Sequence, residues 1–313
     1  MLNRKLVNQL LLTGNLLLSF SIMSFATPVK SSDSLHRRID STPFRFFFND
    51  RAFVVNDLPA GYYPDLPELP ANNTRDAFVR QYLSRYSSKL GLIRDRSDIF
   101  FHVMDSILIH YGVPAELKYL AVVESELNNR ALSKVGARGT WQLMPETARI
   151  LKLRVNGAVD ERTHLYKSTV AAAKYLRDLY RLFDDWLLTV AAYNCGPAPV
   201  YKAIRISGSR NFWKLQHLLP AETRGHVKKF IGTHYYFEGK GSAVTLTKTE
   251  RIHYGNMLQE FVARHNMLLR NWKDTAPAPE TPEDGNGSCL VRVNAELHLG
   301  HEQQQGLKSM VQE

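Results

Sequence analysis

A chain of 313 residues, of which 44% are hydrophobic, is long enough to bury one substantial core and a small appendage. Lysine and arginine outnumber aspartate and glutamate by 40 to 30, which suits an anionic partner such as nucleic acid, a membrane face or an acidic polymer. No basic run alternates with aromatic residues as a nucleic-acid groove requires, so we expect no nucleic-acid partner.

The first 26 residues have the three parts of an export signal. Asn3-Arg4-Lys5 provide the positive start, a leucine-rich stretch follows, and Ser24-Phe25-Ala26 ends in small residues at the cleavage positions. We therefore predict cleavage near Ala26 and a periplasmic location. The alternative, an uncleaved membrane anchor, is disfavoured by the polar residues within the apolar stretch.

Residues 27–73 are poor in helical patterns and rich in proline, which occurs at Pro28, Pro43, Pro59, Pro64, Pro67 and Pro70. This composition predicts an extended lead-in that lies on the surface of the following domain. Phe46-Phe47-Phe48 is too apolar for a free tail. We expect it to dock on the domain, with a membrane contact as the alternative.

The pattern becomes helical at Thr74, and we assign residues 74–240 to one helical domain. Its first apolar stripe consists of Phe78, Tyr82, Tyr86 and Leu90, and its second consists of Ile99, Val103, Ile107 and Tyr111. Ser97 before the second stripe and Gly112 after it are typical of helix ends.

Glu124 lies at the end of the next predicted helix. The only charged residue between Leu117 and Val123 is Lys118, so we expect protein to surround this helix on most sides. The spacing i, i+3, i+4 and i+7 places the carboxyl on the apolar face formed by Leu117, Leu120 and Ala121. Loss of water would raise its pKa above the value of about 4.3 for a free glutamate, as a general acid near neutral pH requires. The alternative is that Glu124 follows the last buried turn and is solvated.

Two further blocks follow in the sequence: Gly136-Ala137-Arg138-Gly139-Thr140-Trp141-Gln142-Leu143-Met144-Pro145-Glu146-Thr147-Ala148 and Ala191-Ala192-Tyr193-Asn194-Cys195-Gly196-Pro197. Together with Glu124-Ser125 they resemble the goose-lysozyme-like (SLT, family 1) catalytic domain of lytic murein transglycosylases, over about residues 75–237. The resemblance is specific because three separated motifs agree in order and spacing. Asp160-Glu161-Arg162 and the stretch from Leu219 to Gly225 resemble a membrane-bound branch of that family.

The resemblance implies a mainly α, lysozyme-like fold and an enzyme that acts on peptidoglycan glycan strands. It would cleave the β-1,4 bond between N-acetylmuramic acid and N-acetylglucosamine and leave 1,6-anhydro ends, with Glu124 acting first as acid and then as base. Substrate-binding roles are implied for Ser125, Gly139, Gln142, Met144, Tyr193 and Asn194. Each of these residues also has a simpler interpretation as a backbone partner, a turn, a surface or core residue, or a helix end.

The chain departs from the family pattern at several places. Thr163-His164-Leu165 replace the usual Asp-Pro, and Ala198-Pro199 replace a glycine and a polar residue, which favours a stiffer loop there. The relatives usually carry a lipid-bearing cysteine after the signal, whereas the cysteines of this chain are Cys195 and Cys289. We expect both to be free thiols, with a disulfide between them as the alternative.

Further helices are predicted at residues 145–151, 168–183, 186–193 and 222–237, and residues 241–272 contain a C-terminal amphipathic helix from 249 to 272. Residues 273–313 are predicted to be a linker and tail. The tail has one alternating, strand-like stretch at 291–299 and no recognisable peptidoglycan-binding repeat.

Three other carboxyls, those of Glu126, Glu161 and Glu222, compete with Glu124 for the catalytic role. Two other functions also remain open: a muramidase-type hydrolase of the same bond, and a non-catalytic peptidoglycan-binding scaffold. We predict no cofactor and no metal, because no His or Cys cluster has ligand spacing and no phosphate loop is present. The expected partners are glycan strands, with peripheral contact to the membrane or to cell-wall proteins as a second prediction.

Overall fold

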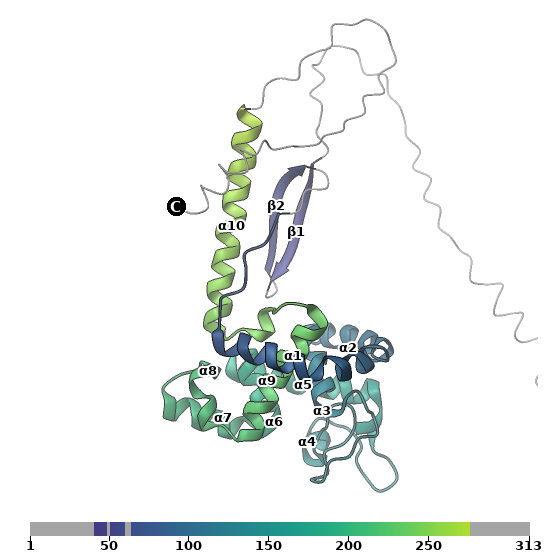
Figure 1. The fold of residues 1–313 in the computed structure, drawn as a ribbon. Coiled ribbons are helices and arrows are strands. Elements are labelled where there is room, and N and C mark those ends of the chain that lie inside the picture. The colour runs from purple at the N-terminus through teal and green to yellow at the C-terminus, as the bar shows by residue number, and fades with distance from the viewer. Residues whose placement is uncertain (1–40, 49–50, 60–63, 276–313) are drawn as a thin grey trace, which may run out of the picture. The chain divides into compact units, whose positions relative to one another are not determined.

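The computed structural model describes residues 41–48, 51–59 and 64–275, and the chain divides after Leu66 into two units (Figure 1). The first unit contains a β-hairpin and the second contains every described helix. Within the described residues, no helix combines the length and apolar composition that crossing a lipid bilayer requires. The predicted export signal, Cys289 and the stretch at 291–299 lie outside the described residues.

The hairpin consists of strands β1 (Ser41–Phe48) and β2 (Arg51–Pro59), which pair antiparallel with Phe46 opposite Phe53. Aromatic and β-branched residues favour this pairing. The register is irregular between Thr42 and Phe44, on either side of Pro43, which has no N–H to donate to the ladder. The sequence predicted an extended segment here but not that it folds back on itself.

The second unit is mainly helical, which confirms the predicted fold class. Its α-helices are α1 (Asn73–Arg94), α2 (Asp98–His110), α3 (Lys118–Ser125), α4 (Pro145–Ile150), α5 (Leu165–Phe183), α6 (Trp186–Cys195), α7 (Pro197–Ser207), α8 (Phe212–Leu215), α9 (Ala221–Glu238) and α10 (Lys248–Thr275). Short 3₁₀ turns are η1 (Ala115–Leu117), η2 (Glu161–Thr163), η3 (Gln216–Leu218) and η4 (Ala243–Thr245). The helices predicted from residues 145, 168, 186, 222 and 249 agree with α4, α5, α6, α9 and α10 to within three residues at each end.

Two helices lie deep in the core. No residue of α6 is charged, and every residue from Trp186 to Ala192 is buried. An uncharged helix of this kind is stable only when protein surrounds it. Helix α3 is similarly buried from Tyr119 to Val122, and α9 packs against both α3 and α6. The residues at the C-terminal ends of α3 and α6 are therefore fixed by the core.

Two sequence predictions are wrong. The chain after Gly196 is not a stiff loop, because α7 begins at Pro197. Proline suits this first helical position, where the missing N–H has no partner to lose. In α2 the buried residues are Met104, Ile107 and Leu108, whereas Ile99 is 78% exposed. The apolar stripe continues past the part of α2 that its neighbours cover.

The segment before α1 is joined to the first turns of α10. The hydroxyl of Tyr254 donates to the carbonyl of Pro67 at 2.7 Å, and the amide of Asn72 donates to Glu250 at 2.9 Å. Asn72 also caps α1 by accepting a hydrogen bond from the backbone N–H of Arg75. These contacts explain why residues from Pro67 onward belong to the helical unit rather than to the lead-in.

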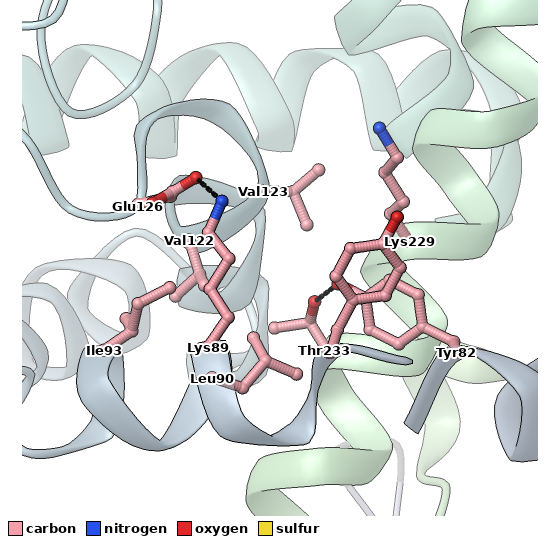
Figure 2. A pocket seen from close by; sticks show the side chains of 10 residues that line it. Tyr82, Lys89, Leu90, Ile93, Val122, Val123, Glu126, Lys229 and Thr233 are labelled. Carbon is pink, nitrogen blue, oxygen red and sulfur yellow. Dashed lines mark hydrogen bonds and ion pairs between the residues drawn. The ribbon is translucent and has the colours of Figure 1, made fainter. Parts of the chain in front are cut away.

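Helices α1 and α9 approach each other closely enough to require a glycine. A Cβ atom at Gly232 would lie 2.3 Å from Cδ1 of Tyr82. The tyrosine ring is held in place, because its hydroxyl is hydrogen-bonded to Thr233 at 3.0 Å (Figure 2). The ring also stacks on Phe78. The small residue on α9 therefore sets the distance between the two helices.

We expect Gly232→Ala to destabilise the protein by about 1 to 3 kcal/mol, because the added methyl group overpacks the contact with Tyr82. The matched control is Gly225→Ala in the same helix, where an added Cβ meets nothing within 4 Å. This control should gain up to about 1 kcal/mol from helix propensity. Urea unfolding of both variants measures the difference. Equal stabilisation by the two substitutions would contradict the close packing of α1 on α9.

Candidate active site

Glu124 lies in the last turn of α3. The helix ends at Ser125 because Glu126 takes a left-handed conformation with φ 55°, and the N–H of Glu126 closes the last turn on the carbonyl of Val122. Leu117, Leu120 and Ala121 are fully buried, and the side chain of Glu124 on the same face is only 14% exposed. The predicted placement of this carboxyl on the apolar face is confirmed.

The environment of Glu124 favours its protonated form. Burial, with a further contribution from the negative charge of Glu222, raises the pKa of Glu124 to about 8. This confirms the direction predicted from the sequence. At neutral pH the carboxyl therefore keeps its proton, which is the state that a general acid needs before it reacts.

His226 is the partner of Glu124 that the sequence analysis missed. It lies in α9, its side chain is 8% exposed, and its Nε2 atom is 3.3 Å from Oε1 of Glu124. This buried nitrogen has no hydrogen-bond partner among the described residues. The only available signal was the spacing of Glu222 and His226 by one helical turn. Nothing in the sequence indicates that this face of α9 packs against α3.

His226 and Glu124 are both neutral near pH 7. Burial, helped by the positive charge of Lys229, lowers the pKa of His226 to about 4. Because the pKa of Glu124 is raised and that of His226 is lowered, their contact is one between an uncharged acid and an uncharged imidazole rather than an ion pair. A raised pKa of the carboxyl and a lowered pKa of the imidazole together keep the proton on the carboxyl.

The loop between α3 and α4 is fixed by side chains from three helices. Ser125 of α3 donates its hydroxyl to the carbonyl of Thr140 at 2.8 Å, and Tyr193 of α6 donates to the carbonyl of Trp141 at 2.7 Å. The indole N–H of the fully buried Trp141 donates to Thr169 of α5 at 2.9 Å. The hydroxyl proton of Ser125 is therefore used within the protein, which agrees with its simpler interpretation as a backbone partner.

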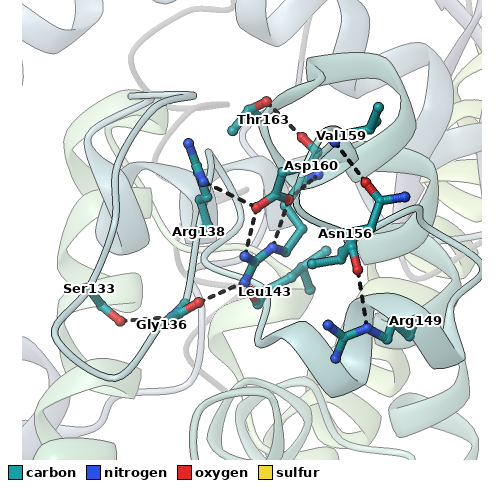
Figure 3. Close-up of polar contacts among 12 residues, drawn as sticks. Ser133, Gly136, Arg138, Leu143, Arg149, Asn156, Val159, Asp160 and Thr163 are labelled. Atoms are coloured by element: carbon teal, nitrogen blue, oxygen red, sulfur yellow. Dashed lines mark hydrogen bonds and ion pairs between the residues drawn. The ribbon is translucent and has the colours of Figure 1, made fainter.

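The side chain of Arg162 supports the same loop by binding the loop's backbone carbonyls. Its Nη1 atom donates to the carbonyls of Gly136 and Leu143 at 2.7 and 2.9 Å, and its other nitrogens bind Asp160. Arg138, within the loop, adds an ion pair with Asp160 at 3.3 Å (Figure 3). Asp160 and Arg162 of the Asp160-Glu161-Arg162 motif thus support the loop.

The loop backbone has a positive φ at two residues that the sequence predicted to bind substrate. Gly139 has φ +81°, and a Cβ there would lie 1.9 Å from the carbonyl oxygen of Arg162. The close approach that glycine permits is thus to the protein backbone. Gln142 has φ 46°, and its amide donates to the carbonyl of Gly139 at 2.8 Å. Met144, directly before α4, is 37% exposed.

Tyr193 and Asn194 at the end of α6 lie near Glu124 and against α9, respectively. The negative charge that Glu124 would carry contributes, after burial, to a pKa of Tyr193 well above its ordinary value, which places the phenol near the carboxyl. Asn194 accepts a hydrogen bond from Thr223 of α9 at 2.7 Å, one residue after Glu222. The structure therefore brings the ends of α3 and α6 and the start of α9 together around Glu124.

The three competing carboxyls have different environments. Glu126 forms an ion pair with Lys89 at 2.5 Å. Glu161 is buried and accepts from the backbone N–H of Arg154 and from the side chains of Lys167 and Arg154, which lower its pKa to about 2. Glu222 is exposed in the first turn of α9. Among the three, Glu222 is the one whose negative charge contributes to the raised pKa of Glu124.

The sequence of this region matches a known domain family. Residues 108–216 match the transglycosylase SLT domain, and this range contains Glu124, the supported loop and Tyr193-Asn194. Membrane-bound lytic murein transglycosylase D of Escherichia coli K12 is 35% identical over 185 residues, which are 58% of this chain and 39% of the relative. The chain therefore spans about two fifths of the length of this curated relative. The resemblance to lytic murein transglycosylases that the motifs predicted is confirmed.

Two solved structures are also similar. The soluble lytic transglycosylase SLT70 of Escherichia coli gives a TM-score of 0.40 at 19% identity, over 60% of this chain and 40% of that chain. An inactive mutant of the lytic transglycosylase Slt of Pseudomonas aeruginosa gives a TM-score of 0.40 at 22% identity, over 53% of this chain and 30% of that chain.

We expect Glu124→Gln to stabilise the protein in a pH-dependent way. The folded pKa of Glu124, about 8, lies above the unfolded value near 4.5, so the folded state loses stability as pH rises between these values. Glutamine does not titrate. The stability gained by the variant should be small below pH 4, grow by up to about 1.4 kcal/mol per pH unit, and level off above pH 8.

Thermal or urea unfolding from pH 4 to pH 9 measures this difference. The control is Glu146→Gln, in which the replaced side chain is 76% exposed, and it should stay within about 0.5 kcal/mol of the parent protein. A stability difference for Glu124→Gln that does not change with pH would contradict the raised pKa.

Proposed function

Because residues 108–216 carry a transglycosylase SLT domain, we propose that the protein is a lytic transglycosylase that cleaves peptidoglycan glycan strands. The bond is the β-1,4 linkage between N-acetylmuramic acid and N-acetylglucosamine, and the product carries a 1,6-anhydro-N-acetylmuramic acid end. The observation that carries this proposal is the protonated, buried carboxyl of Glu124 at the meeting point of the three motifs.

In the first step Glu124 acts as a general acid. It donates its proton to the oxygen between the two sugars as the bond from that oxygen to C1 of N-acetylmuramic acid breaks. Most glycosidases place a second carboxylate opposite the first to act as nucleophile or base. Here the carbonyl oxygen of the sugar's own N-acetyl group bonds to C1 instead, so that no protein nucleophile is needed.

In the second step the ionised Glu124 acts as a general base. It takes the proton of the C6 hydroxyl of the same sugar while that oxygen attacks C1, and the bond from the N-acetyl oxygen to C1 breaks. The ring closes as a 1,6-anhydro product, Glu124 regains its proton, and no water is consumed. One carboxyl with a pKa near the working pH can both donate a proton and accept it back.

His226 acts as a positioning residue for this proton. A neutral imidazole protonated at Nε2 lies 3.3 Å from Oε1 of Glu124 and can donate to it, which leaves the acidic proton on Oε2. The same N–H would stabilise the carboxylate after the proton has moved to the leaving group. This role requires that both groups are uncharged before substrate binds.

The loop and α6 supply the remaining contacts to substrate. Gln142, Met144, Tyr193 and Asn194 bind the sugar ring and its N-acetyl group in this proposal, whereas Ser125 and Gly139 act indirectly by fixing the loop. The support for this division is that Ser125 donates to a loop carbonyl and that Gly139 lies against Arg162. Rigid placement of such residues lowers the cost of reaching the transition state.

A muramidase-type hydrolase is the second candidate, and Glu222 is the observation that favours it. This exposed carboxylate lies near enough to raise the pKa of Glu124, so it is placed to activate a water molecule. A non-catalytic scaffold is the third candidate. The raised pKa of Glu124 argues against it, because a binding protein gains nothing from a carboxyl kept protonated.

The proposed location is the periplasm, where peptidoglycan is accessible. The predicted export signal in residues 1–26 supports it, and the curated relative described above is named as membrane-bound.

We expect Glu124→Gln to abolish the digestion of isolated peptidoglycan, because the amide cannot donate the proton. Glu222→Gln should keep activity within about tenfold of the parent protein and should still release 1,6-anhydro ends. Mass spectrometry of the released fragments distinguishes these ends from reducing ends, which are one water heavier.

Three outcomes would contradict parts of this account. Release of reducing ends alone would replace the transglycosylase with a hydrolase, and loss of activity in Glu222→Gln would then identify the second carboxylate. Unchanged digestion by Glu124→Gln would remove this residue from the chemistry. A parent protein that digests nothing would favour the scaffold.

A further inference from the structure

Thr223 is a buried polar residue in the first turn of α9 that contacts one residue of the site. Only 1% of Thr223 is exposed. Its hydroxyl donates a hydrogen bond of 2.7 Å to Oδ1 of Asn194, which lies in the last turn of α6. Because the two residues are 29 positions apart in the chain, this bond forms only when α6 and α9 are packed together.

Helix α9 reaches the site through two residues on one face. Thr223 and His226 are three positions apart, so their side chains are neighbours on the helix. His226 lies against Glu124 at the end of α3, and Thr223 lies against Asn194 at the end of α6. The same helix therefore holds the amide of Asn194 and the partner of the acid.

The amide of an asparagine can present two opposite hydrogen-bonding groups. Its Oδ1 atom is an acceptor and its Nδ2 atom carries two donors, and half a turn of the side chain exchanges them. The two orientations have nearly the same shape. A site that needs one of them therefore needs a neighbour that disfavours the other.

The hydroxyl of Thr223 disfavours one orientation of Asn194. Its only other polar neighbour among the described residues is the thiol of Cys195, which burial keeps neutral by raising its pKa and which is a weak acceptor. A reversed amide would turn Nδ2 toward the hydroxyl and leave the hydroxyl proton without an oxygen acceptor in a buried residue. Such an unsatisfied donor is costly, so Oδ1 stays against Thr223.

The other side of the amide is available to a ligand. Asn194 is half-buried, and its Nδ2 atom donates to no described residue and is not enclosed by protein. The preceding residue, Tyr193, lies near Glu124. Two N–H groups next to the acid are thus ready to donate, and a glycan carries hydroxyl and carbonyl oxygens that accept.

We propose that Thr223 is a positioning residue that fixes Asn194 as a hydrogen-bond donor to an oxygen of the bound glycan. The inference rests on the proposed function and assigns the direction of one contact within it. Thr223 does not touch the sugar and acts through the amide of Asn194.

Kinetics on isolated glycan strands test the role of the hydroxyl. Thr223→Val keeps the shape of the side chain and lets the amide reverse, so kcat/KM should fall about tenfold. Thr223→Ser keeps the hydroxyl and should stay within about twofold of the parent protein. The matched control is Thr189→Val, which removes a buried hydroxyl of α6 that donates to the backbone carbonyl of Asp185 at 2.8 Å. Equal losses in the two valine variants would overturn the proposal.

Substitutions of Asn194 separate donation to the glycan from support of the helices. Asn194→Asp can still accept from Thr223 but has no donor for the glycan, so it should lose as much activity as Asn194→Ala. Adding Thr223→Val to Asn194→Ala should have no further effect, because the hydroxyl acts through the amide. Full activity of Asn194→Asp, or a further tenfold loss in the double variant, would overturn the proposal.

Nuclear magnetic resonance of the Glu124→Gln protein, labelled with carbon-13 and nitrogen-15 in asparagine, keeps this proposal distinct from the proposed function. Asn194→Asp assigns the signals. The side-chain carbonyl signal of Asn194 should shift in Thr223→Val, because Oδ1 loses its hydrogen bond, and return in Thr223→Ser. Its N–H signals should shift when soluble glycan fragments bind. Both shifts would support the proposal even if the parent protein showed no turnover, whereas the absence of either would overturn it and leave a measured lytic activity intact.

Discussion

The rest of the site depends on keeping a proton on a carboxyl that has been removed from water. An isolated buried carboxylate is costly, and the protein avoids this cost by leaving Glu124 protonated beside a neutral imidazole rather than by providing a cation. Burial raises the pKa of the carboxyl and lowers that of the imidazole, because it disfavours the charged form of each group. The result is a carboxyl that keeps its proton near neutral pH, as the proposed general acid requires.

The surrounding helices hold the elements around Glu124 in fixed positions. Helices α3 and α6 are buried on nearly all sides, so their C-terminal ends cannot move independently of the core. Three helices hold the loop that carries Gln142, and the side chain of Arg162 binds two of its backbone carbonyls. Ser125, Gly139 and Asp160, which belong to the sequence motifs, therefore make contacts within the protein that support the loop. The left-handed backbone at Gln142 persists because so many contacts fix the loop.

The sequence was sufficient for the features that depend on local pattern. The apolar face of α3 placed the carboxyl of Glu124 correctly, and the ranges predicted for α9 and α10 agree with the structure to within three residues at each end. The sequence did not predict the contacts that depend on how distant segments pack together. Nothing local indicates that His226 meets Glu124, that Ile99 is left uncovered, or that Gly139 faces Arg162. The hairpin of β1 and β2 was missed because proline at position 43 interrupts its alternation.

The most direct test of the central claim is a titration of the Glu124 carboxyl and the His226 ring in one sample. Nuclear magnetic resonance of protein labelled with carbon-13 at both side chains would follow them, with Glu124→Gln assigning the carboxyl signal. We predict a carboxyl that is protonated at pH 7 and loses its proton near pH 8, beside a ring that stays neutral until about pH 4. A carboxyl that titrates near its ordinary pKa beside a charged imidazolium at pH 7 would contradict the account.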